Sequence, residues 1–276
     1  MVGTPIGNRA DLSLRALHVL ALVDAIACED TRHSAPLLRL LGLDKPLMAV
    51  HQHNEREAAM TVIARLHKGE RVACISDAGT PAISDPGAAL VSAVTAAGYR
   101  CVPIPGPSSA IAALSVAGDT RAEGFRFIGF PASRGHERAR ALARLAAEPA
   151  TTLVLEAPHR IESLAAALAD RCGDRRVTLC RELTKQFEEI YTTTARSLPA
   201  WLAADPNRLR GEFVVVLHAL NDAASTVENI DAQDATLRRL IGALPLKQAV
   251  ALAAELTGAP RNALYARALV LKAERA

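Results

Sequence analysis

Residues 76–87 read SDAGTPAISDPG and directly follow the apolar run 72–75. Glycine and proline at a strand end let the backbone turn sharply and leave N–H and C=O groups available to a ligand. Open α/β sheets bind ligands at the carboxyl ends of their strands. The first Ser-Asp-x-Gly copy therefore indicates a ligand loop containing Asp77, although an ordinary strand-to-helix turn would use the same residues. The second copy predicts a helix start, with Ser84 or Asp85 as N-cap and Pro86 opening the helix.

Short apolar runs alternate with helical patterns on both sides of this loop. Strands are expected at 24–28, 47–50, 72–75 and 101–104, and helices at 54–68 and 86–98. This alternation predicts a mostly parallel sheet with helices on its faces. A second series has strands expected at 125–130, 151–155, 177–180 and 213–217, with helices at 136–147 and 159–171.

The expected architecture is therefore two α/β domains with a cleft between them, followed by a small helical C-terminal module. The stretch PIPGPSS at 103–109 cannot continue a helix or a central strand, so the junction is placed there. The predicted ranges are 1–107 for the first domain, 108–220 for the second, 221–235 for a linker and 236–276 for the module. Within the module, two apolar-periodic segments flank 257–260 and predict a helix-turn-helix.

Composition excludes several classes of protein. The 276 residues are 50% hydrophobic, yet no apolar run approaches a membrane span, so a cytoplasmic protein without a membrane partner is expected. The five cysteines form no C-x-x-C pair, which disfavours a disulfide or zinc framework. The net charge is +3, and arginines gather at 133–145 and 170–176, where a solvated helix face is the simplest interpretation. Only 3% of residues are aromatic, which disfavours base stacking along a row of rings.

Polar loops follow most of the expected strands. HQHNE at 51–55 brings two histidines together, but Asn54 is placed as a helix N-cap and no metal site is predicted. EDTRHS at 29–34 is either part of a site or a capped helix start. EAPHR at 156–160 and RELTKQFEE at 181–189 end strands of the second series. Together these loops predict a substrate cleft between the domains.

Seven ordered motifs make the chain similar to a known family. VGTPIGNRADLSLRAL, IACEDTRHSAPLL, SDAGTPAISDPG, PIPGPSSAIAALSVAG, TLVLEAPHR, RELTKQFEE and GEFVVVL run over residues 2–220, and the tail from 244 fits as well. The chain resembles the ribosomal RNA small subunit methyltransferase I family of the tetrapyrrole-methylase-like superfamily. Members usually begin with a longer first strand before Gly-Thr-Pro, so either this strand is short or the start codon is misassigned.

The resemblance implies a homodimeric enzyme that binds S-adenosylmethionine between its domains and methylates the 2'-oxygen of a cytidine ribose in the decoding region of 16S rRNA. The RNA substrate is expected within the small ribosomal subunit. The implied cofactor-binding positions are Thr4, Pro5, Asp77, Ala78, Gly79, Thr80, Ser108, Ser109, Glu156, Ala157, Gly211 and Glu212.

Methyl transfer to a ribose hydroxyl needs positioning and benefits from a general base. The candidates for catalysis are Glu29, His159, Glu182 and Lys185, and the sequence does not choose among them. The candidates for RNA binding are Asp30, Arg32, His53 and Arg160. Two rival functions are a methyltransferase acting on a tetrapyrrole and a non-catalytic RNA-binding protein.

Overall fold

A computed structural model describes residues 1–51, 54–220, 234–257 and 261–273. The first sheet has the order β2-β1-β3, built from Leu47–Ala49, Ala25–Cys28 and Val72–Ile75, and both pairings are parallel. The predicted parallel sheet is therefore confirmed. Because side chains alternate along a strand, Ile26 and Ala73 face one core, whereas Ala27 and Cys74 face another.

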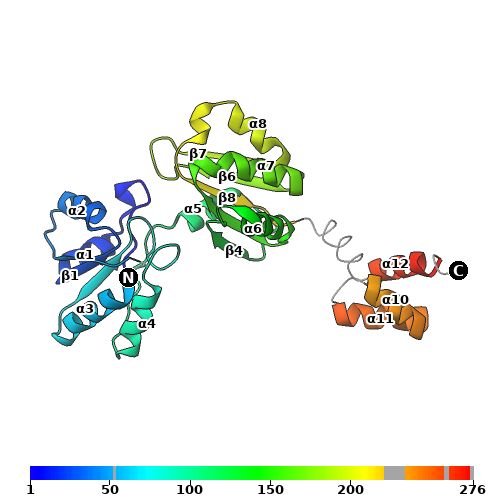
Figure 1. The fold of residues 1–276 in the computed structure, drawn as a ribbon, viewed down its shortest axis with the longest axis horizontal. Coiled ribbons are helices and arrows are strands. Elements are labelled where there is room, and N and C mark those ends of the chain that lie inside the picture. The colour runs from blue at the N-terminus through cyan, green and yellow to red at the C-terminus, as the bar shows by residue number, and fades with distance from the viewer. Residues whose placement is uncertain (52–53, 221–233, 258–260, 274–276) are drawn as a thin grey trace.

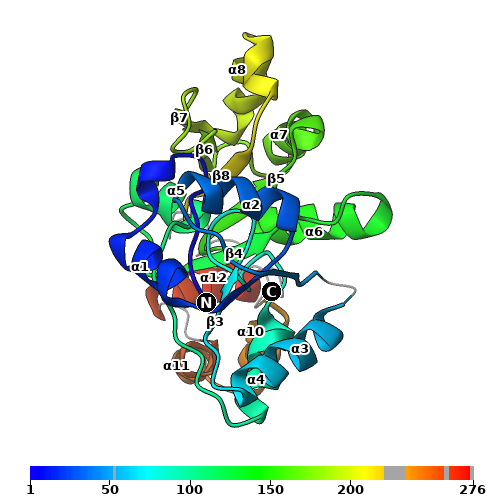
Figure 2. The ribbon, with the colours of Figure 1, turned by 90° about the vertical axis from the view of Figure 1, so that its left-hand side faces the viewer.

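Helices cover both faces of this sheet. On one face lie α1 (Leu14–Leu22) and α2 (Thr31–Leu40), and on the other α3 (Glu55–His67) and α4 (Ala88–Ala96). Figures 1 and 2 both place α3 beside α4. Helix α1 begins after Ser13, whose hydroxyl accepts a hydrogen bond from the Ala16 N–H, and a short 3-10 helix at Arg9–Asp11 precedes it.

The second sheet is mixed and has the order β4-β5-β8-β6-β7. Its strands are β4 (Phe125–Gly129), β5 (Thr151–Glu156), β6 (Arg176–Arg181), β7 (Glu189–Thr194) and β8 (Phe213–Leu217). Strand β8 runs antiparallel to both β5 and β6, so Phe213 at its start pairs with the last residues of both. The carboxyl ends of β5 and β6 and the amino end of β8 therefore lie at the same end of the sheet's strands.

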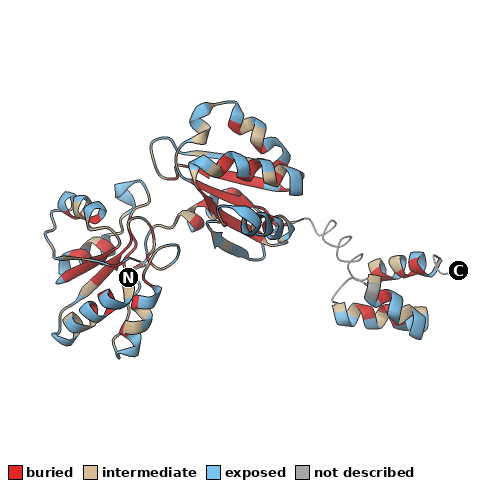
Figure 3. Cartoon of the chain, viewed as in Figure 1, coloured by how far each residue is buried: buried red, intermediate tan, exposed pale blue. Residues whose placement is uncertain are grey.

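Helices pack on both faces of this second sheet too. One face carries α6 (Gly135–Ala147), α7 (Ile161–Cys172) and α8 (Leu198–Ala203), and the other carries α5 (Ser109–Ala117). Short 3-10 helices occupy Pro158–Arg160, Ala195–Ser197 and Pro206–Leu209. Figure 3 shows the inner strands of this sheet buried almost throughout. Helix α5 therefore packs with the second sheet, and the division of the chain near residue 107 stays a prediction.

The C-terminal module contains three helices among its described residues, α10 (Asp234–Ala243), α11 (Leu246–Thr257) and α12 (Arg261–Ala273). They share a core that includes Leu237, Val250 and Leu264. Arg267 holds Asp234 through two hydrogen bonds of 2.9 and 2.7 Å. Of the predicted turn at 257–260, Thr257 is the last residue of α11, and residues 258–260 lie outside the described residues. None of the described helices has the length and apolar character that a membrane crossing needs.

Two local predictions are wrong. The strand expected at 101–104 is reduced to a single bridge between Val2 and Ile104, because Pro103 and Pro105 lack the N–H groups that a ladder requires. The helix expected from Pro86 begins instead at Ala88, with Gly87 as N-cap at φ +136°. Neither Ser84 nor Asp85 therefore serves as the N-cap.

Candidate functional site

The loop after β3 is held from below by Thr4. The backbone N–H and C=O of Thr4 form two hydrogen bonds with Gly79, of 2.9 and 3.0 Å, and its hydroxyl donates to the Ser76 carbonyl at 3.1 Å. Gly79 sits at φ +83°, a conformation that favours glycine. Thr4 is fully buried, so its side chain fixes the loop from beneath.

The segment around Gly106 crosses the N-terminal segment at Gly3. A Cβ on Gly3 would lie 2.8 Å from the Gly106 Cα, so neither position has room for a side chain. The Thr80 hydroxyl donates to the Pro107 carbonyl at 3.0 Å and ties this segment to the β3 loop. The three predicted loops around residues 4, 79 and 107 thus form one hydrogen-bonded unit.

Asp77 and Ala78 line a cavity of about 430 Å³ between the two domains. The Asp77 carboxylate accepts a hydrogen bond of 3.2 Å from the Asp30 N–H at the start of α2. Residues of the second domain close the cavity, and they include Lys185 and Glu212. The structure therefore brings together predicted residues that lie more than a hundred positions apart. The other lining residues are Pro5, Ile6, Gly7, Arg9, Arg32, His33, Ser34, Pro36, Leu37, Ile75 and Ser76.

The second-domain wall is a fixed arrangement of Glu182, Lys185, Gly211 and Glu212. Glu182 Oε1 accepts from Lys185 Nζ and from the Glu212 N–H, both at 2.9 Å, and Lys185 Nζ also lies 3.1 Å from Glu212 Oε2. Glu182 and Gly211 have φ of +50° and +97°. A Cβ on Gly211 would lie 2.5 Å from the Glu182 Cγ. This turn tolerates only glycine at residue 211.

The same contacts determine the protonation states of Lys185 and Glu182. Burial disfavours the charge of Lys185, but its hydrogen bonds to Glu182 and Glu212 outweigh burial and raise its pKa. Burial alone would raise the pKa of Glu182, yet the Glu212 N–H and Lys185 outweigh it and lower that pKa. At neutral pH the wall therefore presents a protonated amine between two carboxylates.

A second, more apolar cavity of about 250 Å³ adjoins this wall and shares Ile6 and Glu212 with the first. Four predicted cofactor residues line it, namely Ser109, Glu156, Ala157 and Glu212. The remaining lining residues are Phe130, Leu155, Pro158, Cys180, Leu183, Phe213 and Val214. Because Ile6 and Glu212 line both cavities, the two adjoin, and we refer to them together as the cleft.

Glu156 lies beneath the apolar cavity with its side chain fully buried. Its carboxylate pairs with Arg160 at 2.6 Å and with Arg138 at 3.1 Å, and it accepts from the Ala157 N–H at 3.0 Å. Buried carboxylates are tolerated when they are paired in this way. Both oxygens are thus committed to the protein, and the same contacts hold Arg160 away from solvent.

Three carboxylates of the first domain, Glu29, Asp77 and Asp85, lie close enough to interact, and of these Asp77 lines the cavity. Burial raises the pKa of Glu29, and the neighbouring carboxylates Asp85 and Asp77 raise it further. Burial also raises the pKa of Asp85, against the effect of a hydrogen bond with Ser76. Asp85, which the sequence suggested as a helix cap, therefore belongs to this acidic group. Such a group favours a bound cation.

Of the other predicted residues, Arg32 lines the first cavity. The Arg32 side chain is 89% exposed and pairs with Asp30 at 2.7 Å, and Asp30 caps α2 as the alternative interpretation expected. His159 is exposed on the 3-10 helix that follows β5. Ser108 is the N-cap residue of α5, without a side-chain capping bond. His53 lies outside the described residues.

Some residues of the cleft escaped the sequence reasoning. Phe130 lines the apolar cavity, and its place just after β4 could have indicated this, since the other cleft loops also follow strands. Arg138 stands in an arginine-rich helix, and no local pattern separates it from Arg134 or Arg140. Only the position of Glu156 in space distinguishes it.

Comparisons with known proteins identify the family of the chain. The family model described as Tetrapyrrole (Corrin/Porphyrin) Methylases matches residues 1–199, and the one described as RsmI C-terminal HTH domain matches residues 228–272. A protein of Pseudomonas aeruginosa named ribosomal RNA small subunit methyltransferase I is 48% identical over 98% of this chain and 95% of its own length. One of the same name from Xylella fastidiosa is 46% identical over 96% of both chains.

Solved structures show the same fold at low sequence identity. A cobalt precorrin-4 methyltransferase of cobalamin biosynthesis has a TM-score of 0.57 and 17% identity, covering 79% of this chain and 92% of its own. A diphthine synthase has a TM-score of 0.58 and 16% identity, covering 79% and 88%. The match to the family model and the similarity over nearly full length together show that the chain belongs to the ribosomal RNA small subunit methyltransferase I family, within the tetrapyrrole methylases.

Proposed function

We propose that the chain uses S-adenosylmethionine to methylate the 2'-oxygen of a cytidine ribose in the decoding region of 16S rRNA. The observation that carries the proposal is the cleft between the domains, whose walls come from the sequence motifs on which the family resemblance rests. The names of those relatives state an activity on small-subunit ribosomal RNA. The particular nucleotide and the 2'-oxygen are the finer part of the proposal.

The residues of the cleft fit S-adenosylmethionine. Its cavities of about 430 and 250 Å³ together match the size of a small-molecule site. The acidic group around Asp77 suits a positively charged sulfonium, and the apolar cavity around Leu155 suits a planar adenine. When bound, the cofactor supplies an electrophilic methyl group. We propose that Pro5, Asp77, Ala78, Gly79, Thr80, Ser108, Ser109, Ala157, Gly211 and Glu212 hold it, with Thr4 and Glu156 supporting them.

Among the four catalytic candidates, Glu29 fits the role of general base best. Lys185 has a raised pKa and stays protonated, so it cannot accept the hydroxyl proton. The pKa of Glu182 is lowered, which makes its carboxylate a weaker base. The pKa of Glu29 is raised by burial and by neighbouring carboxylates, and this strengthens it as a base. His159 is exposed beside the cleft, and we assign it no role in proton transfer.

A Glu29→Gln variant tests this role. We expect its maximal methylation rate to fall by about 10²-fold or more while calorimetry shows unchanged cofactor affinity. Glu57→Gln on α3 removes an exposed carboxylate of the same domain and serves as the control. An unchanged rate in Glu29→Gln would remove Glu29 from the reaction.

We propose that the RNA lies along the side of the cleft that carries Arg32, with Asp30, His53 and Arg160 nearby. The guanidinium of Arg32 reaches solvent, so it can contact a phosphate. Arg160 pairs with Glu156 and is better suited to shaping the cleft than to binding RNA. Arg32→Ala should weaken activity on the RNA and leave cofactor affinity unchanged. Equal activity of parent and variant would exclude Arg32 from the RNA path.

The decisive experiment maps ribose methylation on small-subunit RNA from cells with and without the protein. Loss of a single 2'-O-methyl cytidine in the decoding region, restored by the parent but not by Asp77→Ala, is the expected result. Purified small subunits and naked 16S rRNA from the deficient cells then serve as alternative substrates with labelled S-adenosylmethionine. An unaltered methylation map would overturn the proposal.

A second candidate function is methylation of a tetrapyrrole. It is favoured by the fold neighbours, one of which is named as a uroporphyrin-III C-methyltransferase and has a TM-score of 0.55. Incubation with a precorrin substrate and labelled cofactor distinguishes the two, because only this rival predicts a labelled macrocycle. The third candidate, a non-catalytic RNA-binding protein, predicts no binding of S-adenosylmethionine by calorimetry.

We further propose that the protein acts in the cytoplasm as a homodimer. Strand β4 is the edge strand of the second sheet and carries exposed Phe125 and Ile128, and neighbouring α5 exposes Ile111 and Val116. Exposed apolar side chains gathered in this way mark protein interfaces. Ile128→Lys should produce monomers in light scattering, whereas Leu14→Lys, at an exposed position of the first domain, should not.

A further inference from the structure

A pocket lies where the strands of the second sheet have their other ends, away from the cleft. Strand β6 begins at Arg176 in this pocket and ends at Arg181 beside the cleft, a separation of about 17 Å along the strand. Four arginines line the pocket, which measures about 890 Å³, and we name it the arginine pocket. They are Arg121, Arg171, Arg175 and Arg176.

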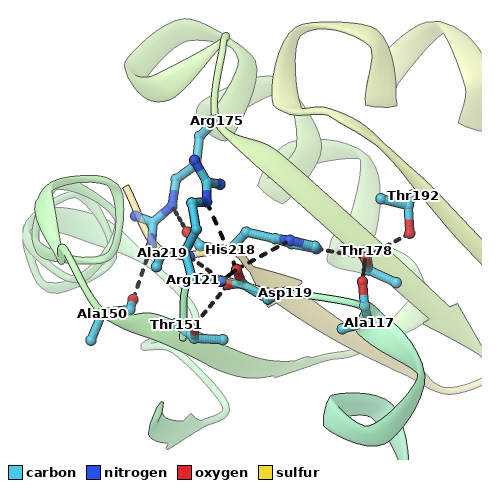
Figure 4. Close-up of polar contacts among 10 residues, drawn as sticks. All are labelled: Ala117, Asp119, Arg121, Ala150, Thr151, Arg175, Thr178, Thr192, His218 and Ala219. Atoms are coloured by element: carbon cyan, nitrogen blue, oxygen red, sulfur yellow. Dashed lines mark hydrogen bonds and ion pairs between the residues drawn. The ribbon is translucent and has the colours of Figure 1, made fainter. Parts of the chain in front are cut away.

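Arg175 is buried at the base of this pocket. Its guanidinium donates to four backbone carbonyls, at 2.7 Å to His218, 3.0 Å to Ala150 and 3.3 Å to both Leu145 and Ala146. Figure 4 shows the side chain directed at His218 and Ala150. Among the described residues no carboxylate forms an ion pair with it. The four neutral carbonyls stabilise this buried cation, and the carboxylates Glu148 and Asp119 add to this from a longer distance. An anion in the pocket would stabilise it further.

The rim of the pocket adds to this charge. Arg171 and Arg176 are exposed, and neither forms an ion pair within the part of the chain that the structure describes. Two carboxylates also line the pocket, but Asp174 is already neutralised by Arg196 at 2.9 Å, which leaves Asp170. Arg121 is paired as well, with its Nε 4.0 Å from the Asp119 carboxylate. Arg171, Arg175 and Arg176 against Asp170 still give the arginine pocket an excess of positive charge, with two guanidinium groups available at its mouth.

The chain leaves the second domain at this same pocket. Asp119, whose side chain is 2% exposed, accepts a hydrogen bond of 2.6 Å from the Ala219 N–H, as Figure 4 shows. The Leu220 N–H donates to the Pro149 carbonyl at 2.9 Å. Both Ala219 and Leu220 line the pocket. The C-terminal module begins at Asp234, and the thirteen intervening residues can span at most about 45 Å. An RNA held by the module is thus within reach of the pocket.

We propose that the arginine pocket binds a phosphodiester of the substrate RNA, at a site separate from the cleft. The proposal rests on the proposed function for the identity of the RNA. Arginine is suited to this role because its planar guanidinium matches a phosphate through paired hydrogen bonds. The open pocket and its exposed rim suit a continuous backbone. Contacts at two edges of the second domain would fix the direction in which the RNA crosses it.

The test removes the two rim charges from the full chain. An Arg171→Gln/Arg176→Gln double variant is compared with an Arg39→Gln/Lys68→Gln double variant, which removes two exposed charges from the first domain. Fluorescence anisotropy measures affinity for a labelled fragment of small-subunit rRNA over a series of KCl concentrations. Thermal unfolding confirms that both variants fold.

We expect the rim variant to bind about tenfold more weakly, with a salt slope reduced by about one to two, because each lost phosphate contact removes a released counterion. The control should match the parent. Parent-like binding by the rim variant, or equal weakening of both variants, would overturn the proposal. A third outcome would also overturn it: inorganic phosphate raises the Tm of the parent but not of the rim variant, while both bind RNA with equal affinity. That result would indicate a site for free phosphate.

Methyl transfer to 16S rRNA is measured on the same preparations. If the parent shows no methylation but the rim variant loses RNA affinity as expected, the proposed function fails and the arginine pocket stands. If the parent methylates RNA and the rim variant binds it as tightly as the parent does, the pocket fails and the proposed function stands. The two proposals are therefore separable.

Discussion

Replacing Glu156 with glutamine should destabilise the second domain without changing its shape. The carboxylate is fully buried and contacts Arg160 at 2.6 Å and Arg138 at 3.1 Å. Removing one partner of a buried ion pair typically costs about 3–5 kcal/mol, because the other charges stay buried. Arg138 and Arg160 have side chains 12% and 18% exposed, so water partly screens them and the lower end applies. We therefore expect a loss of about 3 kcal/mol in the free energy of unfolding.

The assay uses the single tryptophan of the chain, Trp201, which packs against the core of the second domain. Its ring stacks on that of Tyr191, with the ring centroids 4.3 Å apart. Urea unfolding followed by its fluorescence reports this domain. With a slope of about 2 kcal/mol per molar urea, the midpoint should fall by about 1.5 M. Glu162→Gln, at an exposed position of α7, is the control and should unfold like the parent. If both variants unfold at the same urea concentration, the ion-pair reasoning is refuted.

Three further results are expected. Gly211→Ala should destabilise the second domain by more than Gly129→Ala, as measured by the same fluorescence assay, because both glycines have positive φ but only a Cβ on Gly211 meets the Glu182 side chain. The difference should be about 1–3 kcal/mol, and equal losses would exclude the clash. Burial raises the pKa of Glu29 above 4.5 in the folded state. The folded protein therefore holds this proton to a higher pH than the unfolded chain does. The free energy of unfolding consequently falls as the pH rises from 4.5 through the folded pKa. Glu29→Gln should consequently be more stable than the parent at neutral pH and lose that advantage in acid, whereas a constant difference in Tm across pH would contradict this. A chain ending at Leu220 should keep its affinity for S-adenosylmethionine in calorimetry and lose methylation of the small subunit, and retained activity would show that the C-terminal module is dispensable.

Much of the fold was predictable because its signals are local. Strand β3 is a short apolar run that ends in a glycine-rich loop, and β5 and β8 are similarly apolar. Strand β7, with the sequence EIYTTT, was missed because it lies at the sheet edge and carries no apolar run. The start of α4 was misplaced because Gly87 adopts φ +136°, which no side-chain pattern reveals.

The site was predictable only in part. Asp77, Lys185 and Glu212 were chosen from motifs, and they line one cavity. The sequence could not indicate that the Glu156 carboxylate is already committed to two arginines, because Arg138 comes from another helix. The arginines at 170–176 were interpreted as a solvated helix face, yet Arg175 is buried against four carbonyls that come from separate segments.

The pairing of the first residues with later segments also has a consequence for synthesis. The Val2 N–H donates to Cys74, and Gly3 packs against Gly106. These partners leave the ribosome long after the first residues do. At about 5–20 residues per second, the first strand segment waits about 5–20 s for residue 106 to be made. The Val2 N–H lacks its native acceptor until Cys74 is made, and Gly3 lacks its packing partner until Gly106 is made. Slow translation of this region should therefore extend the time in which a chaperone can bind the first segment.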